Sequence, residues 1–359
     1  MADATPPSQV PSPPIKEQPA MNRKLTTHDF DQVLAELSRT WRLLGPKRFP
    51  GHGAFSGSDV TGYGEITNRN DLFLDDKTWF SPKECLFPIR ETLFHFHDQT
   101  TSDVTFDDRP TIILLRPCDI HGIHRLDTIF LNNGQEPDFY YARRRERIKF
   151  FLIECRESYE SCFCVSMQTN KTDDYACALR FDQDGVAIHV RDELFATTFA
   201  TGTAIEPFLE FVSANPTRVT IPNLEGIDLN DVFQHDLWQE YTSRCIACGR
   251  CNTSCVTCSC FTMQDVAYDR NATLGERRRV WAGCHVDGFT DMAGGHSFRT
   301  RNGDRMRFKT MHKINDFHRR FGVHMCVGCG RCEDVCPEYI SFAHCINRLE
   351  RISRELKHA

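Results

Sequence analysis

The sequence has little that would suit a membrane, an export pathway or a nucleic acid. It contains no run of about 18 apolar residues, which is the length that a bilayer-spanning helix needs. Its first residues lack the charged-then-apolar pattern of a secretory signal, so we expect a cytoplasmic protein. A net charge of -6 over 359 residues does not favour nucleic-acid binding, which needs a basic face. Residues 51–56 are glycine-rich but miss the dinucleotide-binding fingerprint and follow no predicted strand.

The chain divides into three predicted regions. Residues 1–24 are rich in proline and poor in apolar residues, which predicts a disordered tail. Residues 25–232 mix helical and strand patterns, and this mixture predicts an α/β domain. Residues 233–359 predict a mostly α-helical, ferredoxin-like domain, with helices broken by cysteine loops and a final helix that buries Phe342, Cys345 and Leu349.

Four local patterns support this division. Apolar residues recur at helical spacing from Phe30 to Leu44, and Gly45-Pro46 is expected to end that helix and open a loop region. Residues 111–115 and 149–153 are short apolar runs that predict strands. Residues 178–192 alternate around Asp184-Gly185, which predicts a hairpin.

Cysteine is the residue type that the sequence has in excess. There are 18 cysteines, and most of them are clustered. In a reducing compartment, such clusters bind metals rather than form disulfides. Cys85, Cys177 and Cys345 stand apart from the clusters and are interpreted as small apolar core residues.

Two cysteine runs near the C-terminus repeat one another. Each has the spacing C-x2-C-x2-C-x3-C, and their ligand candidates are Cys245, Cys248, Cys251 and Cys255 in the first run and Cys326, Cys329, Cys332 and Cys336 in the second. This spacing is typical of ferredoxins with two [4Fe–4S] clusters. Gly249 and Gly330 follow the second cysteine of each run and are expected to let backbone amides turn toward the sulfides.

In ferredoxins of this pattern the fourth cysteine of a run binds the other cluster. We therefore assign Cys245, Cys248, Cys251 and Cys336 to one [4Fe–4S] cluster, and Cys326, Cys329, Cys332 and Cys255 to the other. Pro337 follows the second run as the motif expects, whereas Val256 stands where the first run would have proline.

Seven other cysteines are candidate ligands of a third or a fourth cluster. One group, at the carboxyl ends of the two predicted strands and in the loop beyond, is Cys118, Cys155, Cys162 and Cys164. If those strands are parallel neighbours, the four thiols meet at one edge of the sheet. The other group, Cys258, Cys260 and Cys284, lies between the two runs and could be completed by His285 or a shared thiol. Buried free thiols are the alternative for both groups.

Longer strings in the sequence resemble the iron–sulfur subunit of the anaerobic sulfite reductases. The resemblance runs from about Leu25 to near the C-terminus. It depends on RPCDI at 116–120, FLIECRESYESCFCVSMQTNKTD at 151–173, RCIACGRCNTSC at 244–255, DVAYD at 265–269, GERRRVWAGC at 275–284, FTDMAGGHSFR at 289–299 and MCVGCGRCEDVCP at 325–337. The resemblance implies an electron-transfer subunit between a flavin subunit that oxidises NADH and a sirohaem subunit that reduces sulfite to sulfide.

Three other functions stay open. The beta subunits of soluble sulfhydrogenases are more distant relatives with a similar cysteine layout, and they move electrons between a nickel–iron site and a flavin subunit. A stand-alone reductase with an active-site cluster would turn over as the isolated chain. A zinc-binding scaffold would also use C-x2-C pairs, and it would be colourless.

Overall fold

The computed structural model describes residues 21–358. The predicted disordered tail therefore lies mostly outside the described residues. Its last four residues belong instead to strand β1, which pairs with β9 and β10. No helix within the described range is both long and apolar enough to cross a bilayer.

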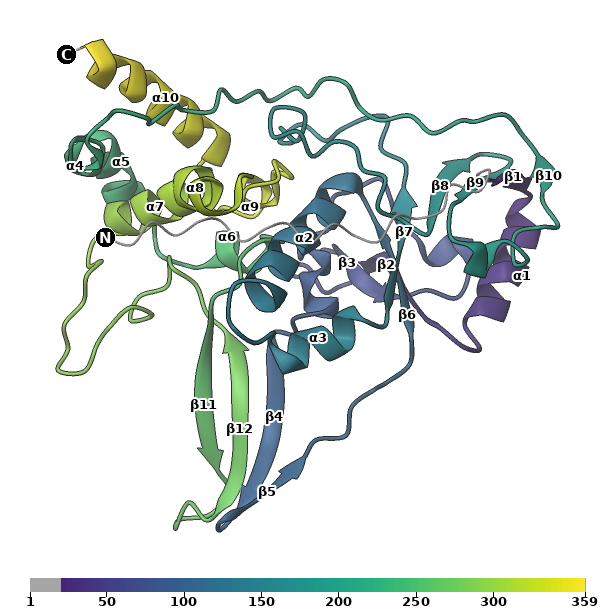
Figure 1. Cartoon of the computed structure of the whole chain (residues 1–359), viewed down its shortest axis with the longest axis horizontal. Coiled ribbons are helices and arrows are strands. Elements are labelled where there is room, and N and C mark those ends of the chain that lie inside the picture. The colour runs from purple at the N-terminus through teal and green to yellow at the C-terminus, as the bar shows by residue number, and fades with distance from the viewer. Residues whose placement is uncertain (1–20, 359) are drawn as a thin grey trace.

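An eight-stranded mixed sheet is the centre of the N-terminal part (Figure 1). In spatial order its strands are β10 (Thr203–Ala204), β1 (Met21–Leu25), β9 (Gly185–Val190), β8 (Cys177–Asp182), β7 (Ile148–Ile153), β6 (Thr111–Leu115), β2 (Arg42–Phe49) and β3 (Val60–Glu65). The pairs β2–β6, β6–β7 and β7–β8 are parallel, and the other pairs are antiparallel. The predicted strands at 111–115 and 149–153 and the hairpin at 178–192 are confirmed.

Helices cover both faces of this sheet. Helix α1 (Thr27–Leu37) packs on one face, while α2 (Pro117–Leu131) and α3 (Phe139–Arg145) pack on the other. Strands β6 and β7 are apolar without alternation because each is buried on both sides. The α/β prediction for this part of the chain is therefore confirmed.

The predicted helix from Phe30 to Leu44 is too long. Helix α1 ends at Leu37, and Leu44, Gly45 and Pro46 lie inside β2, so the expected loop region begins with a strand. Pro46 is tolerated there because β2 pairs with β6 only along Arg42–Leu44, and a proline beyond that stretch costs no ladder hydrogen bond with β6.

A second sheet projects from the body (Figure 1). Its spatial order is β11 (Phe261–Ala267), β12 (Leu274–Trp281), β4 (Arg90–His97) and β5 (Thr100–Asp103), and all its pairs are antiparallel. The hairpin β11–β12 lies where the sequence predicted only helices and cysteine loops. Residues 233–359 therefore contain both helices and strands. The pairing of β12 with β4 joins this region to the N-terminal part.

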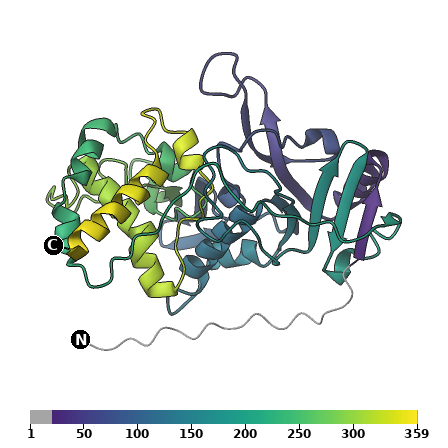
Figure 2. The ribbon, with the colours of Figure 1, turned by 90° about the horizontal axis from the view of Figure 1, so that it is seen from above.

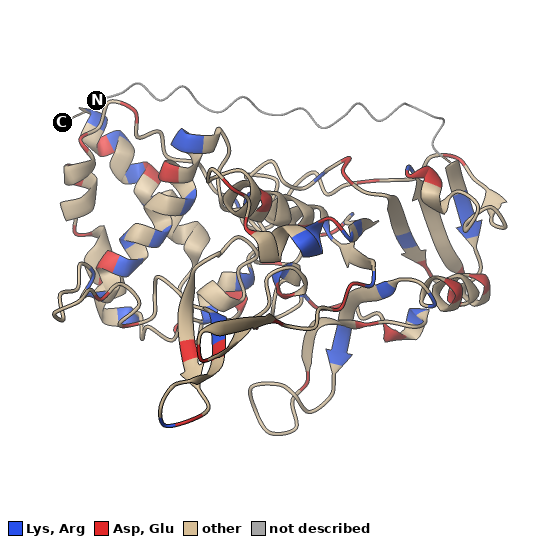
Figure 3. Ribbon diagram, turned by 60° about the horizontal axis from the view of Figure 1, so that its bottom comes forward, with Lys and Arg blue, Asp and Glu red and all other residues tan. Residues whose placement is uncertain are grey.

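The remaining C-terminal elements are helices, which gather at one end of the molecule (Figure 2). They are α4 (Leu229–Gln234), α5 (Leu237–Arg244), α6 (Arg250–Thr253), α7 (Asn302–Met311), a π-helical turn (His312–Asp316), α8 (Phe317–Phe321), α9 (Arg331–Asp334) and α10 (Phe342–His358). Helix α10 buries Phe342, Cys345 and Leu349 as predicted. Basic and acidic residues are interspersed over these helices (Figure 3), and the ion pair between Arg348 and Glu240 joins α10 to α5.

Candidate functional site: two cysteine-lined cavities

The two cysteine runs fold into the same local shape. At the residue before the second cysteine, Ala247 and Gly328 have φ of 56° and 64°. At the residue after it, Gly249 and Gly330 have φ of 75° and 72°, and a short helix, α6 or α9, follows each. Left-handed backbone at matched positions turns successive amides and thiols toward one side of the loop. The repeat in sequence is therefore a repeat in structure.

Each run borders a cavity, and its fourth cysteine borders the other cavity. The outer cavity is lined by Cys245, Cys248, Cys251 and Cys336. The inner cavity is lined by Cys326, Cys329, Cys332 and Cys255. Cys332, Lys309 and Phe342 border both cavities and form the wall between them.

Cys248 is the exposed cysteine of the outer set, whereas Cys329, at the matched position, is buried. The names outer and inner follow from this difference.

A histidine with an unpartnered ring nitrogen also lines the outer cavity. His285 is buried, its Nδ1 lies 3.8 Å from Cys245 Sγ, and its Nε2 has no hydrogen-bond partner in the described structure. Burial holds the pKa of His285 well below its usual value, so the ring is neutral. A buried nitrogen without a hydrogen-bond partner destabilises the folded protein, and a sulfide or thiolate of a bound cluster would supply that partner.

Two buried lysines border the inner cavity without a carboxylate beside them. Lys309 and Lys313 are both 3 % exposed, and neither forms an ion pair with a described Asp or Glu. Lys313 Nζ lies 3.3 Å from Cys255 Sγ and 2.7 Å from Thr257 Oγ1. A buried ammonium group needs a negative partner. The neighbouring groups that can supply this charge are cysteine thiolates.

The surroundings of Cys255 favour its deprotonated, thiolate form. A hydrogen bond from the Cys258 thiol, together with Lys313, holds the pKa of Cys255 well below its usual value, although burial opposes this shift. The same hydrogen bond raises the pKa of Cys258, which stays protonated as the donor. By contrast, burial raises the pKa of Cys326 to about 12, so this thiol would need a bound cation in order to ionise.

The donor set, the cavities and the surrounding charge therefore fit iron–sulfur clusters. Within residues 21–358, no group of three or more His, Cys, Asp or Glu side chains converges closely enough to hold a single metal ion. The cysteines instead stand around open cavities, as ligands of a multi-atom group do.

Comparison with known proteins agrees with this geometry. Residues 244–340 match the family model described as a 4Fe-4S dicluster domain. The chain is also 30% identical over 334 residues to the beta subunit of sulfhydrogenase 2 of Pyrococcus furiosus, an alignment that covers 88% of this chain and 95% of that protein. The chain belongs to the sulfhydrogenase beta-subunit family. It is thus a member of a family of iron–sulfur electron-transfer subunits.

In this family member, Val256 replaces the proline that usually follows the fourth cysteine. Its side chain is fully buried against α2, where a Cβ on Gly122 would come within 2.3 Å of Val256 Cγ1. Val256 also packs with Val327 and Cys329 of the other run. The exchange of proline for valine therefore serves the packing between the two parts of the chain.

The candidates Cys118, Cys155, Cys162 and Cys164 lie at one edge of the sheet. The predicted grouping of these cysteines required two parallel neighbouring strands. Strands β6 and β7 are such neighbours, so Cys118 and Cys155 follow adjacent strands. Cys155 Sγ donates to the carbonyl of Glu157 at 3.3 Å.

The other members of this group have separate partners. Cys162 Sγ donates to the carbonyl of Cys329 at 3.7 Å. The Cys164 thiol lies 3.7 Å from Asn215 Oδ1, and burial raises the pKa of Cys164 to about 12. Cys118 packs against the cluster formed by Val256, Val327 and Cys329. Their role as ligands stays a prediction.

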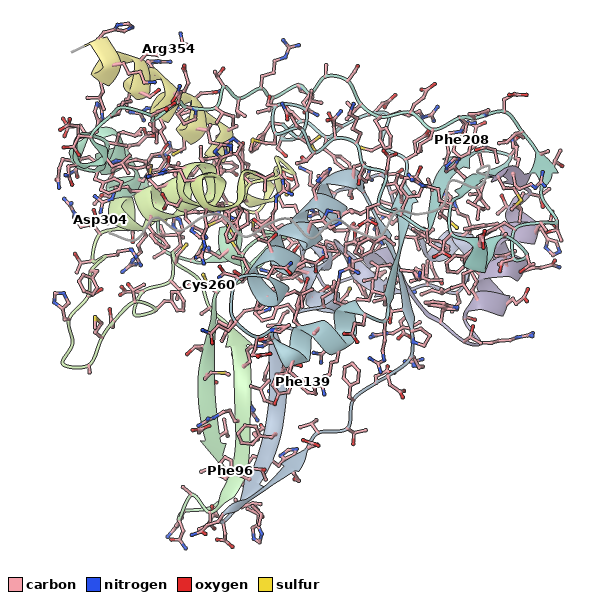
Figure 4. All side chains as sticks on the ribbon, in the orientation of Figure 1. Phe96, Phe139, Phe208, Cys260, Asp304 and Arg354 are labelled. Atoms are coloured by element: carbon pink, nitrogen blue, oxygen red, sulfur yellow. The ribbon has the colours of Figure 1, made fainter. Side chains whose placement is uncertain are left out.

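Cys258, Cys260 and Cys284 lie near the point where β11 leaves the body, and Figure 4 labels Cys260 there. The Asn252 side-chain amide donates to Cys284 Sγ at 3.3 Å and to Cys258 Sγ at 3.6 Å. His285, which could have completed this group, faces the outer cavity instead. A ligand role for these three cysteines also stays a prediction.

Sequence reasoning missed Lys309 and Lys313. They are four residues apart, so they share one face of a helix, and this spacing is the only local signal that they carry. Lys313 lies in the π-helical turn, an irregularity that is frequent at functional sites. Their burial depends on contacts with segments far away in the sequence, which no local pattern reports.

Proposed function

We propose that this chain relays single electrons between redox subunits of a larger complex, through two [4Fe–4S] clusters. One cluster would be held by the cysteines of the outer cavity and the other by those of the inner cavity. A [4Fe–4S] cluster accepts and donates one electron at a time. The residues of this chain supply the thiolate ligands, exclude water and provide buried positive charge.

The crossed lining of the two cavities is the observation that carries this proposal. Cys336 borders the outer cavity beside the first run, and Cys255 borders the inner cavity beside the second. This arrangement is the one that two-cluster ferredoxins use to hold both clusters in one unit. Lys309, which borders both cavities, supplies positive charge to balance anionic clusters.

For the complex itself we propose a hydrogenase of the sulfhydrogenase type. The beta subunit of sulfhydrogenase 2 aligns with nearly the whole of this chain, and the alignment covers 95% of that protein. In this proposal the partners would be two further subunits, one with a nickel–iron site and one with a flavin.

A sulfite reductase is the second candidate, because the strings at 116–120, 151–173 and 275–284 resemble those of the iron–sulfur subunit of the anaerobic sulfite reductases. The partners would then be a flavin subunit that oxidises NADH and a sirohaem subunit that reduces sulfite. Both candidates give this chain the same task.

The test is anaerobic purification of the chain with its partners from its native cells, followed by assays for iron, nickel and sirohaem absorbance. We expect iron and nickel without sirohaem. Iron and sirohaem without nickel would support the sulfite reductase. A colourless, iron-free protein that contains zinc would contradict the cluster assignment.

Two further predictions belong to this proposal. We place the domain boundary near residue 232, with an α/β domain over 25–232 and a ferredoxin-type domain, made of helices and the hairpin β11–β12, over 233–359. We place the complex in the cytoplasm, where a reducing environment keeps cysteine ligands free.

A further inference from the structure

Exposed apolar side chains surround the mouth of the outer cavity. Ile246, Val286 and Tyr339 are 57%, 42% and 87% exposed. Ile246 lines the cavity itself. Val286 lies over the first cysteine loop, since a Cβ on Gly249 would come within 2.7 Å of Val286 Cγ2. These three residues, which we call the mouth patch, come from three separate segments of the chain.

The backbone that carries the mouth patch is held in place. Arg244, at the end of α5, donates to the carbonyl of Glu338 at 3.1 Å and to that of Tyr339 at 3.3 Å. Tyr339 has a φ of 50°, which is uncommon for a residue other than glycine. The next amide, of Ile340, donates to Cys336 Sγ at 3.4 Å. The backbone next to the exposed tyrosine is thus hydrogen-bonded to Cys336, while the tyrosine side chain itself points to the surface.

The shape of the cysteine loop does not require its apolar residue to be exposed. At the matched position in the second run, Val327 is 2 % exposed, so the same motif can bury its apolar residue. Apolar side chains that gather on a surface mark interaction sites. The mouth patch includes Ile246, which lines the same cavity as Cys248, the exposed cysteine of the outer set.

The charge near the mouth patch indicates the kind of partner. Arg250 and Glu338 both line the cavity, and neither side chain forms an ion pair with another described residue. An apolar surface with one unpaired charge of each sign fits a partner surface that is apolar at its centre and carries complementary charges of both signs at its edge.

We propose that the mouth patch is the docking surface for a redox partner protein whose apolar face is rimmed by charges of both signs, and which presents its own electron-carrying group there. This inference rests on the proposed function, because it takes the outer cavity to hold a cluster. The inner cavity has no such exposed border among the described residues, so the outer cavity is the one that opens toward a partner.

Hydrogen exchange tests the surface. The complex, purified anaerobically, is compared with the free chain by mass spectrometry. We expect slower exchange in the complex at residues 245–251, 284–288 and 337–341, and no change around Phe55 and Leu194, which are 81% and 55% exposed on other segments. Protection confined to those two control regions would overturn the proposal, as would recovery of the chain without any companion protein.

A pair of matched variants sharpens this test. Tyr339→Glu places a negative charge in the mouth patch, and Phe55→Glu places one on an equally exposed aromatic residue elsewhere. We expect Tyr339→Glu to weaken binding of the redox partner at least tenfold, and Phe55→Glu to leave it unchanged. Equal affinity of the two variants would overturn the proposal, and so would binding of a second copy of this chain in place of a redox protein.

Iron content and the EPR spectrum of the same samples separate the two proposals. Both variants are expected to keep wild-type iron and wild-type spectra. If the wild-type complex lacks [4Fe–4S] signals, the proposed function fails. If the signals are present but the mouth patch is neither protected nor needed for binding, only the docking surface fails.

Discussion

The two cysteine runs have nearly the same sequence but very different surroundings. Ile246 and Val327 occupy the same place in the motif, and one is 57% exposed while the other is 2 % exposed. Arg250 is exposed, whereas the matched Arg331 is buried and paired with Asp119 at 2.6 Å. A repeated motif therefore specifies the shape of a loop and not its environment.

The cause of the difference is a loop from the α/β part of the chain. A Cβ on Gly330 would lie 2.4 Å from the carbonyl oxygen of Ser161, and a Cβ on Gly328 would lie 2.6 Å from that of Phe163. Residues 161–163 thus cover the second run. Over the first run, only the Val286 side chain comes as close to Gly249. Because residues 161–163 cover the second run and not the first, the cavity beside the second run is buried and the cavity beside the first run opens to the surface.

The strongest test of the two cavities uses their fourth cysteines. Cys336→Ser should remove the cluster of the outer cavity, although Cys336 belongs to the second run, and Cys255→Ser should remove that of the inner cavity. Each variant should lose about half of its iron, since two clusters share it equally. The reduced-state EPR spectrum of Cys336→Ser should match that of Cys248→Ser.

The control is Cys329→Ser, whose spectrum should match that of Cys255→Ser. A match between Cys336→Ser and Cys329→Ser would mean that each run holds its own cluster, and the crossed assignment would be wrong. Circular dichroism of each variant checks that the helices are retained.

A smaller effect is expected from the matched glycines. Gly249→Ala and Gly330→Ala both put a side chain on left-handed backbone, at a cost of about 1–2 kcal/mol. At Gly330 the new Cβ also meets the backbone of Ser161, which cannot rotate away, whereas at Gly249 it meets a valine side chain that can. We expect Gly330→Ala to lose roughly 1–3 kcal/mol more.

Anaerobic denaturant unfolding of the cluster-loaded protein measures this difference. Equal losses of unfolding free energy in the two variants would show that the cover by residues 161–163 does not distinguish the runs.

The smallest effect concerns buried charge. Lys313 lies beside Cys255 of the inner set, so its positive charge favours the reduced, more negative cluster. Lys313→Met should lower the midpoint potential of the inner cluster by up to about 59 mV, a tenfold change for one electron, and leave the outer cluster almost unchanged. EPR-monitored redox titration measures both potentials.

Lys313→Arg, which keeps the charge, should restore most of the potential, and Lys357→Met on the exposed end of α10 should change neither cluster. A shift of the outer cluster as large as that of the inner one would contradict the assignment of Lys313 to the inner cavity.

Sequence patterns predicted the parts of the fold that depend on local contacts. The strands at 111–115 and 149–153 were predictable because unbroken apolar runs suit strands buried on both faces. The end of α1 was predicted incorrectly, because apolar residues beyond Leu37 continue the helical spacing by coincidence while facing the core from β2. The hairpin β11–β12 was missed because β11 is largely exposed, β12 buries the charged residues Glu276 and Arg279, and its partner β4 is distant in sequence.

The sequence by itself determined the ligand chemistry: the cysteine spacing and the glycines of the two loops follow from residues close together in the chain, and that spacing predicted the crossed pairing. Only the tertiary structure decided which cavity is covered, which lysines are buried beside it and where the apolar mouth patch lies. The physical reason is that burial and charge depend on long-range packing. Residues 161–163, Lys309 and Lys313 reach the cysteine runs through the fold and not through the motif.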